Sequence, residues 1–479
     1  MPATAIGASA LLSSSQSNAT VIPANRPNVL FIIADDLTFR MLDASMPRQV
    51  KTPNLDRLAS ESCRFTHCFQ QGGWSGAVCI PSRTMLNTGL TTFKAQHAIP
   101  ANQSFVHPTW GQTFRAAGYE TFITGKWHLD AVSLNRSFEH QRFVGPGFLP
   151  TTRDVYHRPA PGNHWDPTDE TLAGHWLHEA LWKNKQKDSI EHSSSMYADA
   201  AVEFLGSRQK QAQPFFMYVG FNAPHDPRQA PQRFLDMYPA KDIEVPPNFV
   251  PEHPFDQGMS RDRDEMLAPF PRTREDIQVH RREYYAIISH MDEQIGRIFA
   301  ALEATGEAQN TYVIFTADHG LAVGEHGLMG KQNQYECSMH MPLLMKGPGI
   351  RAGSTVNSLV YQHCMFATTC ELAGIPIPEH VEFPSLAKML REEHAPALYD
   401  AVFGWLRQYQ RSVRTEKYRL NFYPQIDRYQ LFDMENDPWE LNDLVDKEQS
   451  APVLNEMKTR LRNLQQSLGD PMLKREENG

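Results

Sequence analysis

The chain has 479 residues, a length that fits one large and one smaller domain, and its 41% hydrophobic and 21% charged residues are ordinary for a globular protein. No apolar run is long enough to span a membrane, and the net charge of -9 comes without the basic stripe that nucleic-acid binding needs. An acidic chain can still bind an anionic substrate in a locally cationic pocket.

The N-terminal segment, residues 1–24, is small and polar, and it lacks the basic start and apolar centre of a convincing signal peptide. We interpret it as a disordered leader or a signal remnant. The cysteines are too few for a disulfide scaffold, and none has the CxxC spacing of a zinc ribbon. They are Cys63, Cys68, Cys79, Cys337, Cys364 and Cys370.

Strands and helices alternate along most of the chain. The first element is an apolar run over residues 28–33, typical of a buried strand, and a helix then opens at Thr52-Pro53 with Thr52 as its cap. This alternation predicts an α/β fold in which helices sandwich a large mixed, mostly parallel sheet. Further helices are expected over residues 110–117, 196–205 and 283–303, and further strands over residues 119–124, 214–221 and 311–316.

Two long segments match no helix or strand pattern well. Residues 130–195 are rich in His, Trp, Pro and Arg, and residues 226–280 are rich in Pro and charge. Long loops inside a compact enzyme usually shape a binding site, although some are surface excursions.

The pattern changes near residue 379. Strands are expected over residues 411–423 and 429–434, and a closing helix over residues 451–468. We therefore expect a catalytic domain over residues 25–380 and a smaller α+β subdomain, with an antiparallel sheet and a helix, over residues 381–479.

Polar clusters follow several of the expected strands. Asp35 and Asp36 follow the first strand, and Asp318 and His319 follow the strand over residues 311–316. In isolation an acidic pair in such a place is as readily a turn or a helix cap. Because sites in open α/β sheets lie at the carboxyl ends of strands, however, the clusters are expected to converge. Three carboxylates and one imidazole favour calcium or magnesium over zinc.

Cys79 begins the sequence Cys-Ile-Pro-Ser-Arg, in which Arg83 comes one helical turn later. A lone cysteine is usually a small buried hydrophobic residue. Here the following proline marks a helix start, where the positive field of the helix N-terminus suits an anionic nucleophile.

This segment resembles the C-x-P-S-R motif of the type I sulfatases of the alkaline phosphatase superfamily, and the resemblance extends from about Arg26 to the end of the chain. The motif continues to Thr88-Gly89, with Asn87 where the family usually has leucine. The resemblance implies that Cys79 is oxidised to formylglycine, whose hydrated form supplies the attacking hydroxyl. An activated, metal-bound oxygen makes chemical sense for a sulfate ester.

The resemblance also implies roles for residues that would otherwise be read as a solvated lysine, a core histidine or a turn histidine. Lys126 and Lys331 would bind sulfate together with Arg83, His128 would hold the formylglycine hydroxyl and assist sulfate release, and His225 would protonate the leaving alcohol. One calcium ion is expected. Its ligands would be Asp35, Asp36, Asp318 and His319, with modified Cys79 beside it.

A sulfatase acting on a sulfated saccharide is therefore expected, because the Asp-His-Gly segment followed by residues 324–327 resembles the iduronate-sulfatase and bacterial polysaccharide-sulfatase branches. Trp405, Arg407 and Tyr409 are candidate substrate-binding residues. The resemblance further implies a formylglycine-generating partner and a periplasmic or secreted location. Two alternatives remain: a phosphonate monoester or phosphodiester hydrolase of the same fold, and a non-catalytic glycan-binding relative.

Overall fold

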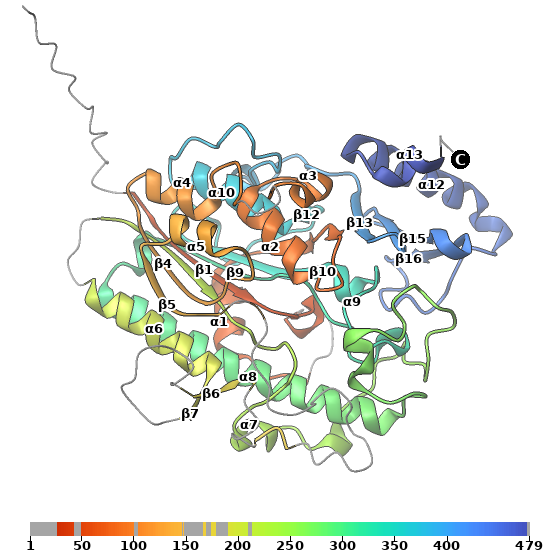
Figure 1. Ribbon diagram of the computed structural model, residues 1–479, viewed down its shortest axis with the longest axis horizontal. Helices are drawn as coiled ribbons and strands as arrows, with labels where there is room; N and C mark the ends of the chain where they lie inside the picture. Colours follow the sequence, from red (N-terminus) through yellow and green to blue (C-terminus); the bar gives the residue numbers. More distant parts are fainter. Residues whose placement is uncertain are drawn as a thin grey trace, which may run out of the picture.

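A mixed sheet forms the centre of the molecule (Figure 1). The computed structural model describes residues 26–42, 49–99, 104–145, 147, 166–168, 174–178, 190–208 and 213–476. In this part of the chain β10 runs antiparallel to both of its neighbours, and the other pairs of the sheet are parallel, as the sequence predicts. The strands lie in the order β11 (Thr355–Val356), β2 (Cys63–Phe69), β10 (His340–Lys346), β9 (Thr311–Ala317), β1 (Asn28–Ala34), β8 (Phe215–Gly220), β4 (Glu120–Lys126) and β5 (His140–Gly145), with β12 (Val360–Tyr361) also paired to β2.

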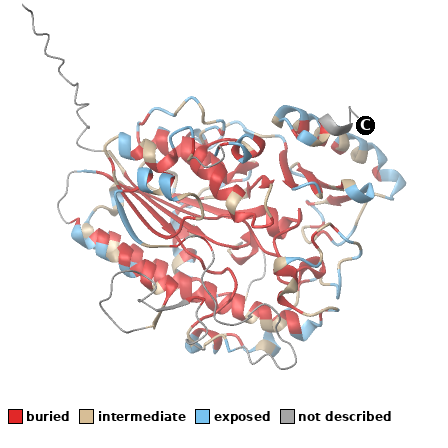
Figure 2. Cartoon of the chain, viewed as in Figure 1, coloured by how far each residue is buried: buried red, intermediate tan, exposed pale blue. Residues whose placement is uncertain are grey.

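Helices cover both faces of this sheet, and the residues of β1 alternate between two cores. Leu30 and Ile32 pack in the core beneath α6 (Ser193–Ser207) and α8 (Arg274–Thr305). Phe31 and Ile33 pack in the core beneath α2 (Cys79–Thr88), α4 (Trp110–Ala116) and α10 (Met365–Leu372). Figure 2 shows how completely the sheet and the inner helix surfaces are buried. The helices are α1 (Pro53–Glu61), α2 (Cys79–Thr88), α3 (Thr92–Gln96), α4 (Trp110–Ala116), α5 (Ala131–Ser137), α6 (Ser193–Ser207), α7 (Gln232–Leu235), α8 (Arg274–Thr305), α9 (Glu336–Met339), α10 (Met365–Leu372), α11 (Ala387–Arg391), α12 (Ala451–Leu468) and α13 (Pro471–Glu476).

The longest helix of the described chain, α8, begins earlier than the sequence predicted. It starts at Arg274 rather than Glu283, because Thr273 and Asp276 form a reciprocal capping box at its N-terminus. Its first turns therefore belong to the segment over residues 226–280, in which no element was expected. The other such segment, residues 130–195, contains α5, β5 and the short hairpin of β6 (Trp176–His178) and β7 (Ile190–His192).

Helix α1 begins at Pro53 as predicted, but its expected cap is wrong. The side chain of Thr52 does not cap the helix; its hydroxyl donates to the carboxylate of Asp56. The first amides of α1, those of Asn54 and Leu55, instead donate to the two carboxylate oxygens of Asp292 on α8 at 3.1 and 2.7 Å. A cap supplied by a distant helix joins α1 to α8, and local sequence gives no sign of it.

A second sheet lies beside α12 near the C-terminus (Figure 1). The single strand expected over residues 411–423 is two strands, because a turn at Thr415 and Tyr418 reverses the chain without any Gly, Pro or Asn. Helix α12 spans residues 451–468 as predicted, while the boundary near residue 380 stays a prediction. The strand order is β16 (Arg428–Asp433), β15 (Tyr418–Tyr423), β14 (Gln410–Arg414), β13 (Val402–Leu406) and β3 (Gly72–Gly73).

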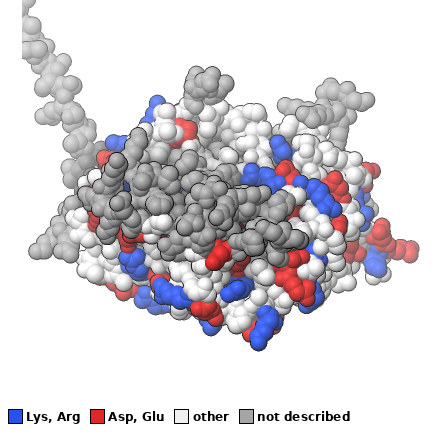
Figure 3. Space-filling view, turned by 60° about the horizontal axis from the view of Figure 1, so that its bottom comes forward, with Lys and Arg blue, Asp and Glu red and all other residues white. Residues whose placement is uncertain are grey.

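Strand β3 links this second sheet to the start of α2, since it comes only a few residues before Cys79 and pairs with β13. On the face shown in Figure 3, acidic and basic side chains are interspersed over the described surface. No helix in the described ranges has the length and apolar character required to cross a bilayer.

Candidate active site

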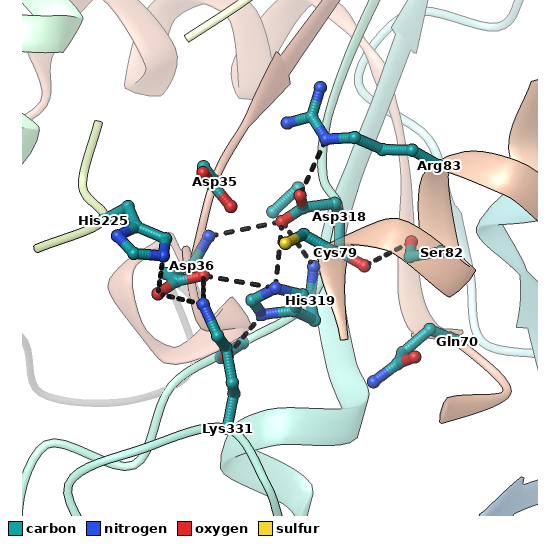
Figure 4. A network of polar contacts seen from close by, with 12 residues as sticks. Asp35, Asp36, Gln70, Cys79, Ser82, Arg83, His225, Asp318, His319 and Lys331 are labelled. Atoms are coloured by element: carbon teal, nitrogen blue, oxygen red, sulfur yellow. Dashed lines mark hydrogen bonds and ion pairs between the residues drawn. The ribbon is translucent and has the colours of Figure 1, made fainter. Parts of the chain in front are cut away.

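The acidic and basic residues singled out in the sequence meet where neighbouring strands end (Figure 4). Asp35 and Asp36 follow β1, Asp318 follows β9, and Lys126 is the last residue of β4. The backbone amide of Asp318 donates to the carbonyl of Ala34 at 3.1 Å, so the two strand ends stay in register as far as the acids. The parallel sheet thus brings together residues that are far apart in sequence.

Cys79 is the first residue of α2, as the motif predicted, and it is fully buried. Its Sγ lies 3.2 Å from Nδ1 of His128, and the Ser82 hydroxyl donates to the Asp318 carbonyl at 2.6 Å, which fixes the helix against β9. Burial would raise the pKa of the Cys79 thiol, but Lys126 and His128 hold it well below its usual range. The position therefore stabilises negative charge on whatever group it carries.

Three buried cations each pair with one of three buried carboxylates. Arg83 Nε donates to Asp318 Oδ2 at 2.9 Å, Lys126 Nζ contacts Asp35, and Lys331 Nζ lies 2.8 and 2.9 Å from the two carboxylate oxygens of Asp36. All six side chains are at most 1% exposed. Such complete burial of charge is costly unless each charge is compensated, and it marks the cluster as a functional site.

The carboxylates offer a site for a hard cation. Asp35, Cys79, Asp318 and His319 place one ligand atom each within 4.8 Å of the others, and Asp35, Asp36 and His225 form a second such group. The Oδ1 atom of Asp35 is buried and has no hydrogen-bond partner among the described residues. Predominantly oxygen ligands with an uncompensated buried oxygen fit calcium or magnesium.

The imidazole ring of His319 is oriented by its backbone neighbour Gly320. Its Nδ1 contacts the carbonyl of Gly320 at 3.0 Å, so Nδ1 carries the proton and Nε2 faces Asp36 at 3.2 Å and Asp318 at 3.5 Å. Burial would lower the pKa of His319, but the carboxylates of Asp318 and Asp36 outweigh burial and raise it to about 9. This pocket therefore favours a positive charge at Nε2.

His225 lies on the other side of Asp36, in the turn after β8 (Figure 4). Its Nδ1 contacts the carbonyl of Asp226 at 2.7 Å and the Asp226 carboxylate at 3.3 Å, while Nε2 lies 3.9 Å from Asp36 Oδ2. Burial opposes protonation, but Asp226 and Asp36 raise the pKa of His225 above its ordinary value. The ring is thus poised to hold a proton on Nε2.

The three residues proposed for substrate binding lie on and after β13. Trp405 is only 4% exposed, and its indole donates to Thr92 Oγ1 at 2.6 Å inside the core of the second sheet. Arg407 is exposed, and together with Trp405 it lines a cavity of about 720 Å³. Tyr409 packs with Val78, which immediately precedes Cys79. Their substrate-binding role stays a prediction.

Several residues that hold the site in place escaped the sequence analysis. Gln362 donates to the Asp318 carbonyl at 2.8 Å, Tyr284 donates to the Asp36 carbonyl at 2.5 Å, and Asp264 lies 3.7 Å from Lys331. None of the three belongs to a local motif. Only Asp264 had any signal in the sequence, because it belongs to a segment that is rich in charged residues.

Comparison with known proteins agrees with this geometry. The sulfatase family profile matches residues 27–375, and the profile described as N-sulphoglucosamine sulphohydrolase, C-terminal, matches residues 324–467. An N-acetylglucosamine-6-O-sulfatase of Bacteroides thetaiotaomicron is 26% identical over 93% of this chain and 87% of its own. A choline-sulfatase of Rhizobium meliloti is 29% identical over 88% of this chain and 83% of its own.

Solved structures share the fold. A protein in complex with its substrate D-glucosamine-2-N,6-O-disulfate superposes with a TM-score of 0.73 at 24% identity, covering 93% of this chain and 98% of its own. A phosphonate monoester hydrolase from Silicibacter pomeroyi superposes with a TM-score of 0.72 at 20% identity, covering 92% and 96%. With a family match over most of its length, this chain belongs to the sulfatase family and is a sulfuric ester hydrolase.

Proposed function

We propose that this sulfatase hydrolyses sulfate esters of a carbohydrate, using formylglycine made from Cys79 and one calcium ion. The observation that carries the proposal is the convergence of three buried acid–cation pairs on the N-terminus of α2, where Cys79 lies. Carboxylates that can bind a metal and cations that can bind sulfate oxygens alternate around one reacting position.

In this proposal the hydrated formylglycine would supply the attacking hydroxyl, and calcium, held by Asp35, Asp36, Asp318 and His319, would offset negative charge on the sulfate oxygens. Arg83, Lys126 and Lys331 would bind and orient the sulfate group from within the same cluster.

The two histidines then divide the proton transfers. His128, whose Nδ1 faces the Cys79 position at 3.2 Å, accepts a proton from the group at that position. Burial lowers the pKa of His128, which suits a base. His225, whose pKa is raised, donates a proton from Nε2 to the leaving alcohol.

A carbohydrate substrate is supported by the relative that is named an N-acetylglucosamine-6-O-sulfatase and by the match of residues 324–467 to a sulphoglucosamine sulphohydrolase region. The choline-sulfatase relative supports a small alkyl sulfate as the competing substrate class. Sulfate release measured across defined sulfated saccharides, with choline sulfate as a matched arm, separates the two. Turnover of choline sulfate alone would overturn the carbohydrate proposal.

An alternative function for this fold is hydrolysis of phosphonate monoesters or phosphodiesters. Its support is the shared fold of the Silicibacter pomeroyi phosphonate monoester hydrolase. Aryl sulfate and aryl phosphodiester substrates with the same leaving group compare the two reactions directly. We expect the sulfate ester to be hydrolysed with the higher kcat/KM.

Formylglycine formation is tested by mass spectrometry of the peptide that contains Cys79, from enzyme produced with and without a formylglycine-generating enzyme. Active protein should lack the thiol and carry an aldehyde, and full activity with unmodified Cys79 would refute the assignment. We also propose a periplasmic or secreted location, which fractionation of the native host would test.

A further inference from the structure

Lys331 lies between two buried carboxylates, only one of which belongs to the proposed metal site. Its Nζ is 2.8 Å from Asp36 Oδ1 and 3.7 Å from Asp264 Oδ2, and all three side chains are at most 2% exposed. An ammonium group enclosed in this way needs an anionic partner from the protein whenever no sulfate group lies beside it, because buried charge without a partner is costly.

Arg83 has a second hydrogen-bond acceptor that is not a carboxylate. Besides pairing with Asp318, its guanidinium donates to the backbone carbonyl of Lys126 at 2.7 Å. It can therefore keep a hydrogen bond if its carboxylate partner turns toward a cation. For Lys331, the corresponding second partner is the carboxylate of Asp264.

The chain holds Asp264 and Lys331 in a fixed relation. The neighbouring Glu265 accepts from the backbone amides of Met329 and Gly330 at 2.9 and 2.8 Å, so the 3₁₀ helix Arg263–Leu267 is joined to the residues just before Lys331. The approach is so close that a Cβ on Gly330 would lie 2.9 Å from Cβ of Asp264.

Gln332 fixes the Asp264 carboxylate itself. Its Nε2 donates to Asp264 Oδ2 and to the carbonyl of Gly76, both at 2.9 Å, and its Oε1 accepts from the amide of Lys331. Asp264 is therefore tied both to the loop that carries Lys331 and to the loop that leads into Cys79.

We propose that Asp264 is a positioning residue that retains the ammonium group of Lys331 when the Asp36 carboxylate binds the metal ion. The inference rests on the proposed function, in which Asp36 is a metal ligand. Lys331 and a divalent cation require the same oxygens of Asp36, and Asp264 relieves that competition by holding the ammonium beside the sulfate site.

The test is a double-mutant cycle in which calcium affinity is measured by calorimetry. Without Asp264, Lys331 depends on Asp36 alone, so Asp264→Asn should weaken calcium binding about tenfold, a typical size for coupled neighbours. In the Lys331→Met background the same substitution should change calcium affinity less than about twofold. Asp262→Asn, an exposed acid of the same segment, is the matched control and should have no effect.

A second variant distinguishes the positioning of Lys331 by Asp264 from the effect of the negative charge of Asp264 on calcium affinity. Gln332→Met leaves the charge of Asp264 in place but removes the hydrogen bond that fixes it, and it should weaken calcium binding only when Lys331 is present. Asp264→Glu should restore part of the affinity. In turnover, Asp264→Asn should raise KM for the sulfate ester more than it lowers kcat at saturating calcium.

The outcomes distinguish the two proposals. If the unsubstituted enzyme binds no calcium, the proposed metal site fails. Suppose instead that the enzyme binds calcium. If Asp264→Asn then lowers calcium affinity by the same factor with and without Lys331, Asp264 does not position Lys331. The same conclusion follows if Asp264→Asn and Asp262→Asn have equal calcium affinity. Should Asp264→Asn not fold, an effect of Gln332→Met that persists in the Lys331→Met background would overturn the inference.

Discussion

His225→Ala should slow the hydrolysis of a sulfated sugar far more than that of a nitrophenyl sulfate. Because Nδ1 contacts Asp226, Nε2 is the atom proposed to donate the proton, and Asp226 and Asp36 favour the protonated ring. General acid catalysis typically contributes about 10²–10⁴-fold, or about 3–5 kcal/mol of barrier. A sugar alkoxide needs that proton, whereas nitrophenolate leaves without it. We therefore expect a loss of about 10²–10⁴-fold for the sugar and about tenfold or less for the aryl ester.

The assay needs steady-state kcat/KM for both substrates with His225→Ala and with Lys126→Met. The lysine variant is the control: because both substrates carry the same sulfate group, it should slow them by similar factors. Thermal unfolding of both variants checks that the fold is intact. If His225→Ala slows both substrates equally, His225 acts on the sulfate or the metal, and His128 becomes the next candidate for the acid.

Three further predictions concern the metal and the stability of the fold. A chelator should abolish activity and calcium or magnesium should restore it; recovery with zinc alone would contradict the oxygen-ligand site around Asp35. Burial lowers the pKa of His363 to about 3, and neither ring nitrogen has a hydrogen-bond partner among the described residues. The imidazole of the unfolded chain titrates near 6.5, so the folded state loses stability as pH falls below about 6.5. In His363→Leu, the free energy of unfolding in urea should therefore depend less on pH, by up to about 1.4 kcal/mol per pH unit between about pH 6 and 4. An unchanged slope would show that His363 does not contribute. Trp110 is fully buried against Phe31 and donates to Thr369, so Trp110→Ala should cost about 3–5 kcal/mol in the same assay, and a loss below about 1 kcal/mol would contradict its role in the core.

The sequence predicts the α/β fold and most of the reacting cluster because strand ends are local signals. A buried apolar run over residues 28–33 and the acids after it are adjacent in sequence. The parallel pairing of β1 with β8 and β9 then brings the ends of these strands together. The same holds for Cys79, whose place at a helix start agrees with Pro81 two residues later, because a helix tolerates proline in its first turn.

The residues that could not be predicted act at a distance. Asp292 caps α1 from another helix, and Asp264 reaches Lys331 only because Glu265 joins two loops. Strands β2 and β10 also escaped prediction, because Arg64, Thr66 and His67 interrupt the apolar pattern of β2, and β10 continues directly from the short helix α9. Pairing partners of this kind depend on tertiary structure, which periodicity does not report.

The pairing of β3 with β13 has a consequence for the timing of synthesis. The strand before Cys79 accepts its inter-strand hydrogen bonds from the backbone amides of Trp405 and Arg407, about 330 residues later in the chain. At about 5–20 residues per second, ribosomal elongation needs roughly 15–65 s to produce that partner. Throughout this interval the segment around Cys79 lacks its final strand pairing, whereas in the finished fold Cys79, Pro81 and Arg83 are buried. Under the proposed function, the enzyme that oxidises Cys79 would therefore have its best access while the second sheet is still being made.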